Sequence, residues 1–293
     1  MHRYLMKSRI KKLILILYFS FIFLTICSCS HTSNKPKSYK PFEILFLNIG
    51  KADCMILKTS KSVIVVDAGN DSDAKVVLSY LKKEEIHTIN DLIITHFDSD
   101  HVGGANILLN NFRTENVYIP NYQNYHHEYI EFSNELFSQN ITPITVNGSI
   151  SSDIDDITLK INGTKKSKYD YDTYNDNEYS LIVDITHGEN TFFLTGDAQK
   201  GRLIELMNSY DGTLEHTLLK LPHHGIPDPN VIAFSQKVHP KYSVITDGGE
   251  VAYFKKLIDS LKQNDSEIYS TKNGTLKCIS DGHSLSITQP YSD

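Results

Sequence analysis

Short apolar runs separated by Gly, Lys and Ser recur along the chain from residue 42 onward. The runs FEILFLNIG, CMILKT and SVIVVDAG are rich in β-branched and aromatic residues, which predicts strands. In DAKVVLSYLKKEEI the apolar residues return every three or four positions, which predicts a helix. The run DLIIT, residues 91–95, is typical of a buried strand, and His96 follows it directly.

The alternation of strands and helices continues to the C-terminal end. Helices are expected over residues 105–111, 127–139, 198–208, 230–237 and 252–262. Strands are expected at NVYIP, ITPITV, ITLKI, SLIVDIT, TFFLTGD, HTLLKLPHH and YSVITDG, followed by three short ones. The polar segment GTKKSKYDYDTYNDNE has no period, which predicts a long loop. Two runs of strands with helices between them predict an α/β sandwich of two sheets with helices outside, without an internal domain boundary.

The N-terminal stretch has a different pattern. Residues 1–12 are basic and contain no acid, and residues 13–26 are almost entirely apolar, which is typical of an export signal. The following TICSCS resembles a bacterial lipoprotein signal, in which a Cys after a small residue is lipidated. Cys29, preceded by Ser28, fits this pattern better than Cys27, preceded by Ile26.

Three segments are therefore expected along the chain. They are a lipoprotein-type signal peptide over residues 1–29, a polar tether over residues 30–41 and a single globular domain over residues 42–293. This organisation places the domain on the extracytoplasmic face of the cell membrane, held there by lipidated Cys29. An uncleaved N-terminal anchor helix is the alternative, and it also exports and tethers the domain.

The net charge of the chain after residue 29 limits the classes of partner that it can bind. Residues 1–29 hold five of the 29 Lys and Arg residues and none of the 35 Asp and Glu residues, so the remainder has 24 basic against 35 acidic residues, a net charge of −11. An acidic surface disfavours general nucleic-acid binding, which depends on neutralising phosphates, but it leaves a metal-dependent phosphodiester site open. Cys54 and Cys278 lie in apolar, strand-like contexts and are interpreted as core residues, with one disulfide possible in an oxidising compartment.

Residues 91–104, DLIITHFDSDHVGG, place four potential metal ligands within six positions. In an extended chain, residues i and i+2 point to the same side, so His96 and Asp98 can converge. A turn after the strand can return Asp100 and His101 to the same point, and the Gly-Gly pair permits close backbone approach and unusual dihedral angles. Solvated turn residues or helix caps are the alternative interpretation, which this combination of residues makes the weaker one.

Two further strand ends carry candidate ligands. TFFLTGD ends at Asp197, and LKLPHHG contains His223 and His224. Taken alone, TGD is a common turn sequence and the His pair could be a surface pair. Together the three strand ends can hold two divalent ions that share a carboxylate, a pair that generates hydroxide at neutral pH. The oxygen-rich ligand set favours zinc or manganese over a site for zinc alone.

These motifs together resemble the metallo-β-lactamase-fold hydrolases, and most closely the soluble hydrolase domain of ComEC-type DNA-uptake proteins. The likeness extends from residue 42 to about residue 288. FLNIGKADCMIL is similar to the subgroup's FLDVGQGDAILI. The segments VIVVDAG, ITHFDSDHVGG, NEYSLIV with Asn177 and Ser180, FFLTGD, LKLPHHG and PKYSVIT follow in the family's order.

The resemblance implies a four-layer αββα sandwich with a dinuclear metal site at one edge. It assigns the first motif to His96, Asp98, Asp100 and His101, and the bridging carboxylate to Asp197. It favours His224 as the last ligand and leaves His223 beside the substrate. Asp98 replaces the second His of the wider superfamily, and no further His ligand is evident before TGD.

Two other differences from the subgroup lie in segments that are expected to contact the substrate. HHGIPDPN lacks the Ser that usually follows HHG, and TDGGEVAYFKK lacks a His-Pro pair found in the subgroup. Asp67 is expected to have a supporting or turn role, and His126 and His127 are interpreted as surface residues.

The function expected from these observations is an exported, membrane-tethered, metal-dependent hydrolase. Its substrate is expected to be a phosphodiester or related ester, attacked by a metal-activated hydroxide, with Asp100 and His223 as the catalytic residues and His223 assisting the leaving group. Nucleic acid is a possible substrate that the acidic charge disfavours. The alternative is a non-catalytic surface module that keeps the fold and a structural metal. β-Lactamase activity is disfavoured by Asp98 and the missing middle His.

Overall fold

The computed structural model describes Met6 and residues 37–165, 175–246 and 255–290. The chain divides into two compact units, Met1–Ser38 and Tyr39–Asp293, and the second contains all the strands described below. Apart from Met6, the predicted signal peptide lies outside the described residues, as does most of the predicted long loop. Among the described residues, no helix combines the length and the hydropathy that crossing a bilayer requires.

Two mixed β-sheets form the centre of the second unit. The first sheet has the order β15-β14-β1-β2-β3-β4-β5-β6, and the second has the order β13-β12-β11-β10-β9-β8-β7. The strands of the first sheet are β1 (Phe42–Phe46), β2 (Met55–Lys58), β3 (Val63–Val66), β4 (Thr88–Ile93), β5 (Arg113–Pro120), β6 (Ile144–Val146), β14 (Leu276–Ser280) and β15 (Leu285–Thr288). Those of the second are β7 (Ser149–Ile154), β8 (Ile157–Asn162), β9 (Ile182–His187), β10 (Asn190–Leu194), β11 (Leu218–Lys220), β12 (Tyr242–Ile245) and β13 (Glu267–Ser270).

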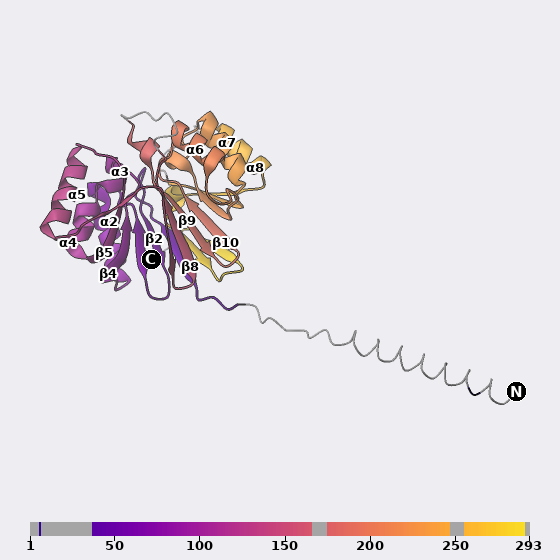
Figure 1. Cartoon of the computed structure of the whole chain (residues 1–293), viewed down its shortest axis with the longest axis horizontal. Coiled ribbons are helices and arrows are strands. Elements are labelled where there is room, and N and C mark those ends of the chain that lie inside the picture. The colour runs from indigo at the N-terminus through magenta and orange to yellow at the C-terminus, as the bar shows by residue number, and fades with distance from the viewer. Residues whose placement is uncertain (1–5, 7–36, 166–174, 247–254, 291–293) are drawn as a thin grey trace. The chain divides into compact units, whose positions relative to one another are not determined.

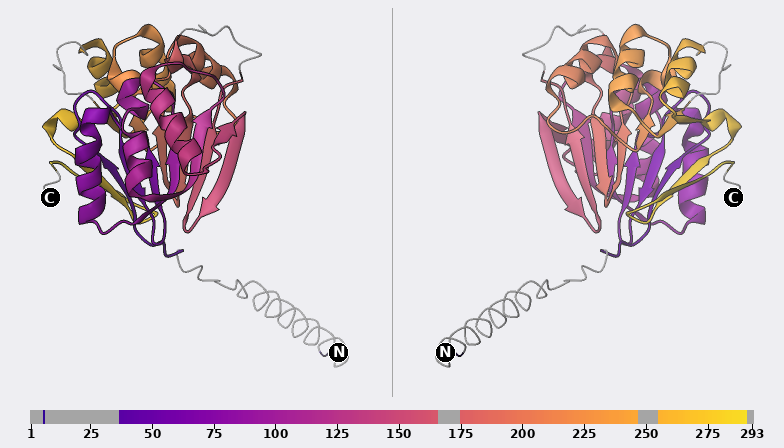
Figure 2. Two further views of the ribbon diagram at one scale, coloured as in Figure 1. Left: turned by 90° about the vertical axis from the view of Figure 1, so that its left-hand side faces the viewer. Right: turned by 90° about the vertical axis from the view of Figure 1, so that its right-hand side faces the viewer.

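Helices cover the outer face of each sheet (Figures 1 and 2). The first group is α2 (Ala74–Lys83), α3 (Ser99–Val102), α4 (Ala105–Asn111) and α5 (His127–Ser138), and the second is α6 (Lys200–Ser209), α7 (Pro229–Val238) and α8 (Lys255–Gln263). Short 3-10 helices are η1 (Asp71–Asp73), η2 (Asp176–Tyr179), η3 (Pro222–Gly225) and η5 (Thr271–Asn273). The expected four-layer α/β sandwich is confirmed.

The alternation of side chains along the strands produces three buried layers. In β1, Leu45 packs toward the helices on its own side, whereas Ile44 and Phe46 pack between the two sheets. In β10, Phe192 also packs between the sheets, and Phe193 packs against α6 and α7. Each central strand is therefore apolar on both faces, which is why these strands appear in the sequence as continuous apolar runs.

The structure differs from the sequence-based prediction in three local details. The strand β7 was not predicted, because most of its Ser-rich residues are exposed and it lacks an apolar face. Residues 99–102, predicted as a turn, form one helical turn. Cys54 and Cys278 are buried core residues as predicted, but both are free, so no disulfide joins them.

The sheet topology gathers several strand ends at one edge. Strands β3 and β4 are parallel, and so are β10, β11 and β12, so their carboxyl ends all point the same way within each sheet. A backbone hydrogen bond from the Leu181 amide to the Thr95 carbonyl, 2.9 Å long, joins the two sheets at this edge. The residues after β4, β10 and β11 therefore meet in one place, as the sequence predicted.

Candidate metal centre

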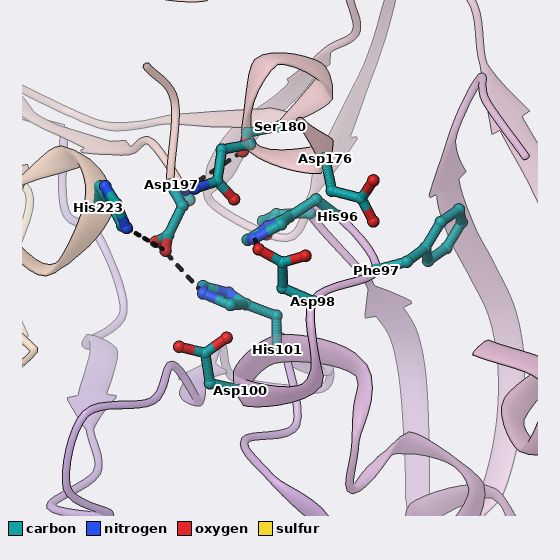
Figure 3. A network of polar contacts seen from close by, with 12 residues as sticks. His96, Phe97, Asp98, Asp100, His101, Asp176, Ser180, Asp197 and His223 are labelled. Carbon is teal, nitrogen blue, oxygen red and sulfur yellow. Dashed lines mark hydrogen bonds and ion pairs between the residues drawn. The ribbon is translucent and has the colours of Figure 1, made fainter. Parts of the chain in front are cut away.

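Four of the candidate ligands, Asp100, His101, Asp197 and His224, form one group whose ligand atoms lie within 4.8 Å of one another. The Nε2 atom of His101 lies 3.2 Å from Asp197 Oδ1, and the Nε2 atom of His224 lies 3.1 Å from Asp197 Oδ2. Asp100 Oδ2 lies 3.3 Å from His224 Nε2. Asp197 thus faces the two imidazoles through different oxygens, which is the geometry expected of a shared carboxylate. Its contact with His101 is drawn in Figure 3.

His96 and Asp98 lie next to this cluster. The ring centroids of His96 and His101 are 4.0 Å apart, and the Nε2 atom of His96 is 3.5 Å from Asp98 Oδ2. Asp98 is also grouped with Asp176 and His126, whose ligand atoms lie within 4.8 Å of one another. The six ligands predicted from the sequence therefore lie together, but they divide into two neighbouring positions.

All three candidate His ligands are held through their Nδ1 atoms. His101 Nδ1 donates to Asp67 Oδ2 at 2.8 Å, and His224 Nδ1 donates to the Thr246 carbonyl at 2.8 Å. Thr95 Oγ1 donates to Asp67, which leaves that oxygen to accept from His96 Nδ1 at 3.0 Å. With a proton on each Nδ1, the Nε2 atom of each ring is the nitrogen that is left to bind a cation, whether a proton or a metal ion.

The three Nε2 atoms are buried and make no hydrogen bond, although carboxylate oxygens lie nearby. Buried nitrogen atoms without partners are costly unless a ligand satisfies them. Imidazoles fixed at one nitrogen by a carboxylate or carbonyl are also the usual form of metal-ligating His. The residues present therefore fit a divalent cation bound by nitrogen and carboxylate oxygen.

Burial and the neighbouring carboxylates shift the pKa values of His101 and His224 in opposite directions. Burial by itself lowers the pKa of His224, but Asp197, Asp100 and Asp53 raise it to about 10. In the same way, Asp197 and Asp67 overcome burial and raise the pKa of His101 well above its usual value. The carboxylates therefore attract positive charge strongly, and a divalent cation can replace the protons that they draw onto these rings.

A buried ion pair beneath the cluster was not predicted from the sequence. Lys220 Nζ pairs with the Asp53 carboxylate, donates to the Gly196 carbonyl at 2.9 Å and lies 3.4 Å from Asp197 Oδ1. Both side chains are fully buried. A Lys inside the otherwise apolar strand LLKL was the available sequence signal, because a charge is rarely placed there without a partner.

His223 occupies a different position from His224. Its Nε2 atom is 3.9 Å from Asp197 Oδ2, and its Nδ1 atom accepts a hydrogen bond of 2.7 Å from the Gln199 side-chain amide. Burial is the main reason that the pKa of His223 is lowered to about 4. This ring is therefore neutral at pH 7 and carries its proton on Nε2, next to the candidate ligands.

The backbone at the site is unusual in two places. His223 and His224 both have left-handed dihedrals, with φ of 48° and 52°, which is uncommon for residues with a side chain and is often seen at functional sites. Gly103 and Gly104 have ordinary helical dihedrals, so the predicted unusual angles were wrong. The predicted close approach is confirmed, because a Cβ atom at Gly104 would lie 2.4 Å from the Ala68 carbonyl oxygen.

This fold and ligand arrangement define a class of protein, and the sequence comparison agrees. Residues 47–245 match the Metallo-beta-lactamase superfamily, and the chain belongs to that superfamily. It is 23% identical over 266 residues to ComE operon protein 3 of Bacillus subtilis, covering 80% of this chain and 32% of that protein. It is also 23% identical over 219 residues to Recombination protein 2 of Haemophilus influenzae, covering 73% of this chain and 25% of that protein.

These two relatives confirm the resemblance to ComEC-type proteins, and the chain spans between a quarter and a third of their length. Among solved structures, the metallo-beta-lactamase fold protein YhfI from Bacillus subtilis superposes with a TM-score of 0.53 and 12% identity, covering 84% of this chain and 100% of that one. A putative metal-dependent hydrolase from Parabacteroides distasonis gives a TM-score of 0.51 and 14% identity, covering 80% and 97%. At these identities, the similarity establishes the fold.

Proposed function

We propose that the protein is a metal-dependent hydrolase that cleaves a phosphodiester or a related ester. The observation that supports this most directly is the set of three buried Nε2 atoms, on His96, His101 and His224, which make no hydrogen bond and lie beside carboxylates. Two divalent cations in such a site supply Lewis acidity and a nucleophilic water at neutral pH. We propose zinc or manganese, since the ligands combine imidazole with carboxylate.

The chain's own residues have distinct roles in this proposal. Asp197 would be the carboxylate shared by the two cations, and Asp100 and His224 would be ligands of one of them. Ser180 Oγ accepts from the Asp197 amide at 3.2 Å and so fixes the segment that carries the bridge (Figure 3). Asp67 and Thr246 hold His101 and His224 in the ligating tautomer.

We propose that His223 contacts the substrate. Being neutral, it does not act as an imidazolium acid, but its Nε2–H can donate a hydrogen bond to an oxygen of the substrate or leaving group. Gln199 holds the ring in this tautomer, and Asn175 Nδ2 in turn donates to Gln199 Oε1 at 2.7 Å. This orients a donor toward the position where an oxyanion would develop.

An anionic substrate is supported by the charge around His223. Lys51 is exposed in the turn before β2 and lies near enough to contribute to the lowered pKa of His223. A cation at this place can attract a phosphate group toward the ligands. The acidic remainder of the domain favours a small phosphodiester over a long nucleic acid, which requires many phosphate contacts.

Hydrolysis of bis-p-nitrophenyl phosphate by the full-length chain, extracted in detergent, tests this proposal. We expect turnover with added manganese or zinc, loss of turnover on chelation and loss in both Asp100→Ala and His101→Ala. A panel of nucleic acids, phosphocholine esters and lactones then identifies the substrate class. Bound metal without turnover on any of these would favour the non-catalytic surface module, and turnover that survives both substitutions would overturn the proposal.

We further propose that the domain is exported and tethered to the membrane through lipidated Cys29. The basic and apolar N-terminal segments and the Ser28-Cys29 pair support this. Cells given a radiolabelled fatty acid should label the wild-type chain and the Cys27→Ala variant, and fail to label Cys29→Ala. Labelling that persists in Cys29→Ala would assign the lipid to Cys27, and membrane association without any label would support an uncleaved anchor helix.

A further inference from the structure

The four candidate ligands that group together come from both sheets. Asp100 and His101 lie in α3, after β4 of the first sheet, whereas Asp197 follows β10 and His224 follows β11 of the second. A metal site needs its ligands held to within about 0.5 Å of the productive geometry. Contacts that join the two sheets beneath the ligands must therefore fix their separation.

We infer that the buried ion pair of Asp53 and Lys220 positions these ligands and so sets the affinity of the site for cations. Asp53 lies in the loop between β1 and β2 of the first sheet, and Lys220 is the last residue of β11 in the second. Both are positioning residues and not ligands. The inference rests on the proposed function, because it concerns the cations that the proposed reaction requires.

Asp53 contacts three of the four candidate ligands. Its backbone amide donates to the Asp100 carbonyl at 3.0 Å. Its carboxylate oxygens lie 3.8 Å from His101 Nδ1 and 3.5 Å from His224 Nδ1. In both rings the Nδ1 atom is on the opposite edge from the Nε2 atom that faces Asp197. Asp53 therefore supports the two imidazoles from behind, as outer partners of metal-ligating His commonly do.

Lys220 contacts the fourth candidate ligand. Its fully buried Nζ atom pairs with Asp53, donates to the Gly196 carbonyl at 2.9 Å and lies 3.4 Å from Asp197 Oδ1. An ammonium group has three donors, and these three acceptors account for them. Lys220 therefore acts on the backbone and the carboxylate of the shared ligand, and through Asp53 it links them to the ligands of the first sheet.

Positioning and charge predict opposite effects for one substitution. Lys220→Met removes a positive charge beside Asp197, so charge alone would tighten the binding of a divalent cation, whereas loss of positioning would weaken it. In a double variant with Asp53→Asn and Lys220→Met the two lost charges cancel. Such a neutral replacement of a buried ion pair by side chains of similar size is often tolerated. The double variant therefore isolates the geometric contribution of the pair.

Calorimetric titration of the full-length chain with Mn²⁺ measures these effects without any substrate. We expect the Kd for Mn²⁺ to rise at least about tenfold both in Lys220→Met and in the double variant. Lys220→Arg keeps the charge but not the single nitrogen that meets three acceptors, so it should also raise the Kd. Circular dichroism establishes that each variant used in the comparison is folded.

The matched control combines Lys58→Met with Glu84→Gln, which removes an ion pair of 2.6 Å outside the candidate ligand groups. Its Kd should equal that of the wild type. A wild-type Kd in the folded double variant, or a lower Kd in Lys220→Met, would overturn the inference and leave the proposed function standing. If neither of these variants folds, a wild-type Kd in Lys220→Arg overturns it. Absence of both Mn²⁺ and Zn²⁺ binding by the wild type would instead overturn both proposals.

Discussion

Lys220 forms a fully buried ion pair with Asp53 directly beneath the shared carboxylate Asp197. Burial by itself lowers the pKa of Lys220, but Asp53 and Asp197 raise it above the usual value for a lysine, which favours the charged ammonium. The same pair, with Lys220 as the largest favourable partner, lowers the pKa of Asp53 against the effect of burial. The candidate metal centre thus lies against a buried cation that belongs to the protein itself.

Lys220→Met should therefore destabilise the fold. The substitution keeps the length of the side chain but leaves the Asp53 charge buried without its partner, which costs about 3–5 kcal/mol. Chemical denaturation of the metal-free protein measures this. Lys58→Met is the control, because Lys58 pairs with Glu84 at 2.6 Å on a partly exposed surface and should cost at most about 1 kcal/mol. Equal losses in the two variants would contradict the prediction.

Substitutions of the two adjacent residues His223 and His224 should have different effects, one on catalysis and the other on metal binding. His224→Ala removes an Nε2 atom that lies 3.1 Å from Asp197 and 3.3 Å from Asp100, so it should abolish binding of one cation. His223→Ala should retain both cations and lower kcat by about 10²-fold or more, as expected of a group that assists proton or charge transfer. Metal content after dialysis and steady-state kinetics measure the two effects. Loss of metal in His223→Ala with retention in His224→Ala would reverse the assignment.

Asp67→Asn should weaken metal binding without removing a ligand. Asp67 accepts from His101 Nδ1, from the Thr95 hydroxyl and from the Thr95 amide at 2.8, 2.8 and 2.7 Å. Loss of its charge should raise the Kd for Mn²⁺ by about 10–100-fold. Asn tolerates the left-handed backbone of this residue, where φ is 59°. Asp153→Asn, in the exposed strand β7, should leave the Kd unchanged, and an unaltered Kd in Asp67→Asn would contradict the role assigned to Asp67.

Asp91 should make the stability of the fold depend on pH. Burial raises the pKa of its carboxyl group, partly offset by the hydrogen bond from Asn116 and increased again by Glu115. Because the folded protein holds this proton more tightly than the unfolded chain does, the cost of the ionised carboxylate is present above the folded pKa. That cost disappears as the pH falls through the folded pKa. Asp91→Asn should be more stable than the wild type at pH 7.

Urea denaturation of both proteins between pH 7 and pH 4 measures this difference. The advantage of Asp91→Asn should shrink as the pH falls, since protonation removes the charge that the substitution removes. A constant difference across this range would show that the substitution acts through packing or through the Asn116 hydrogen bond.

The sequence by itself determined the strand order along the chain and the position of the ligand motifs. Strands such as residues 91–95 were predictable because apolar runs and their limits are local properties of the chain. His96, Asp98, Asp100 and His101 could be recognised together for the same reason, since six consecutive positions hold them all. Asp197 and His224 gained significance only from their places at strand ends.

The tertiary structure alone decided which residues surround those motifs. Asp53, Lys220 and Asp176 lie in segments without a recognisable spacing to the first motif, so their proximity depends on how the two sheets pack. The tautomer of each His likewise depends on partners such as Asp67 and the Thr246 carbonyl, which long-range pairing brings into contact. Local patterns fix where a strand ends, whereas burial and electrostatics across the edge where the sheets meet fix what each side chain there can bind.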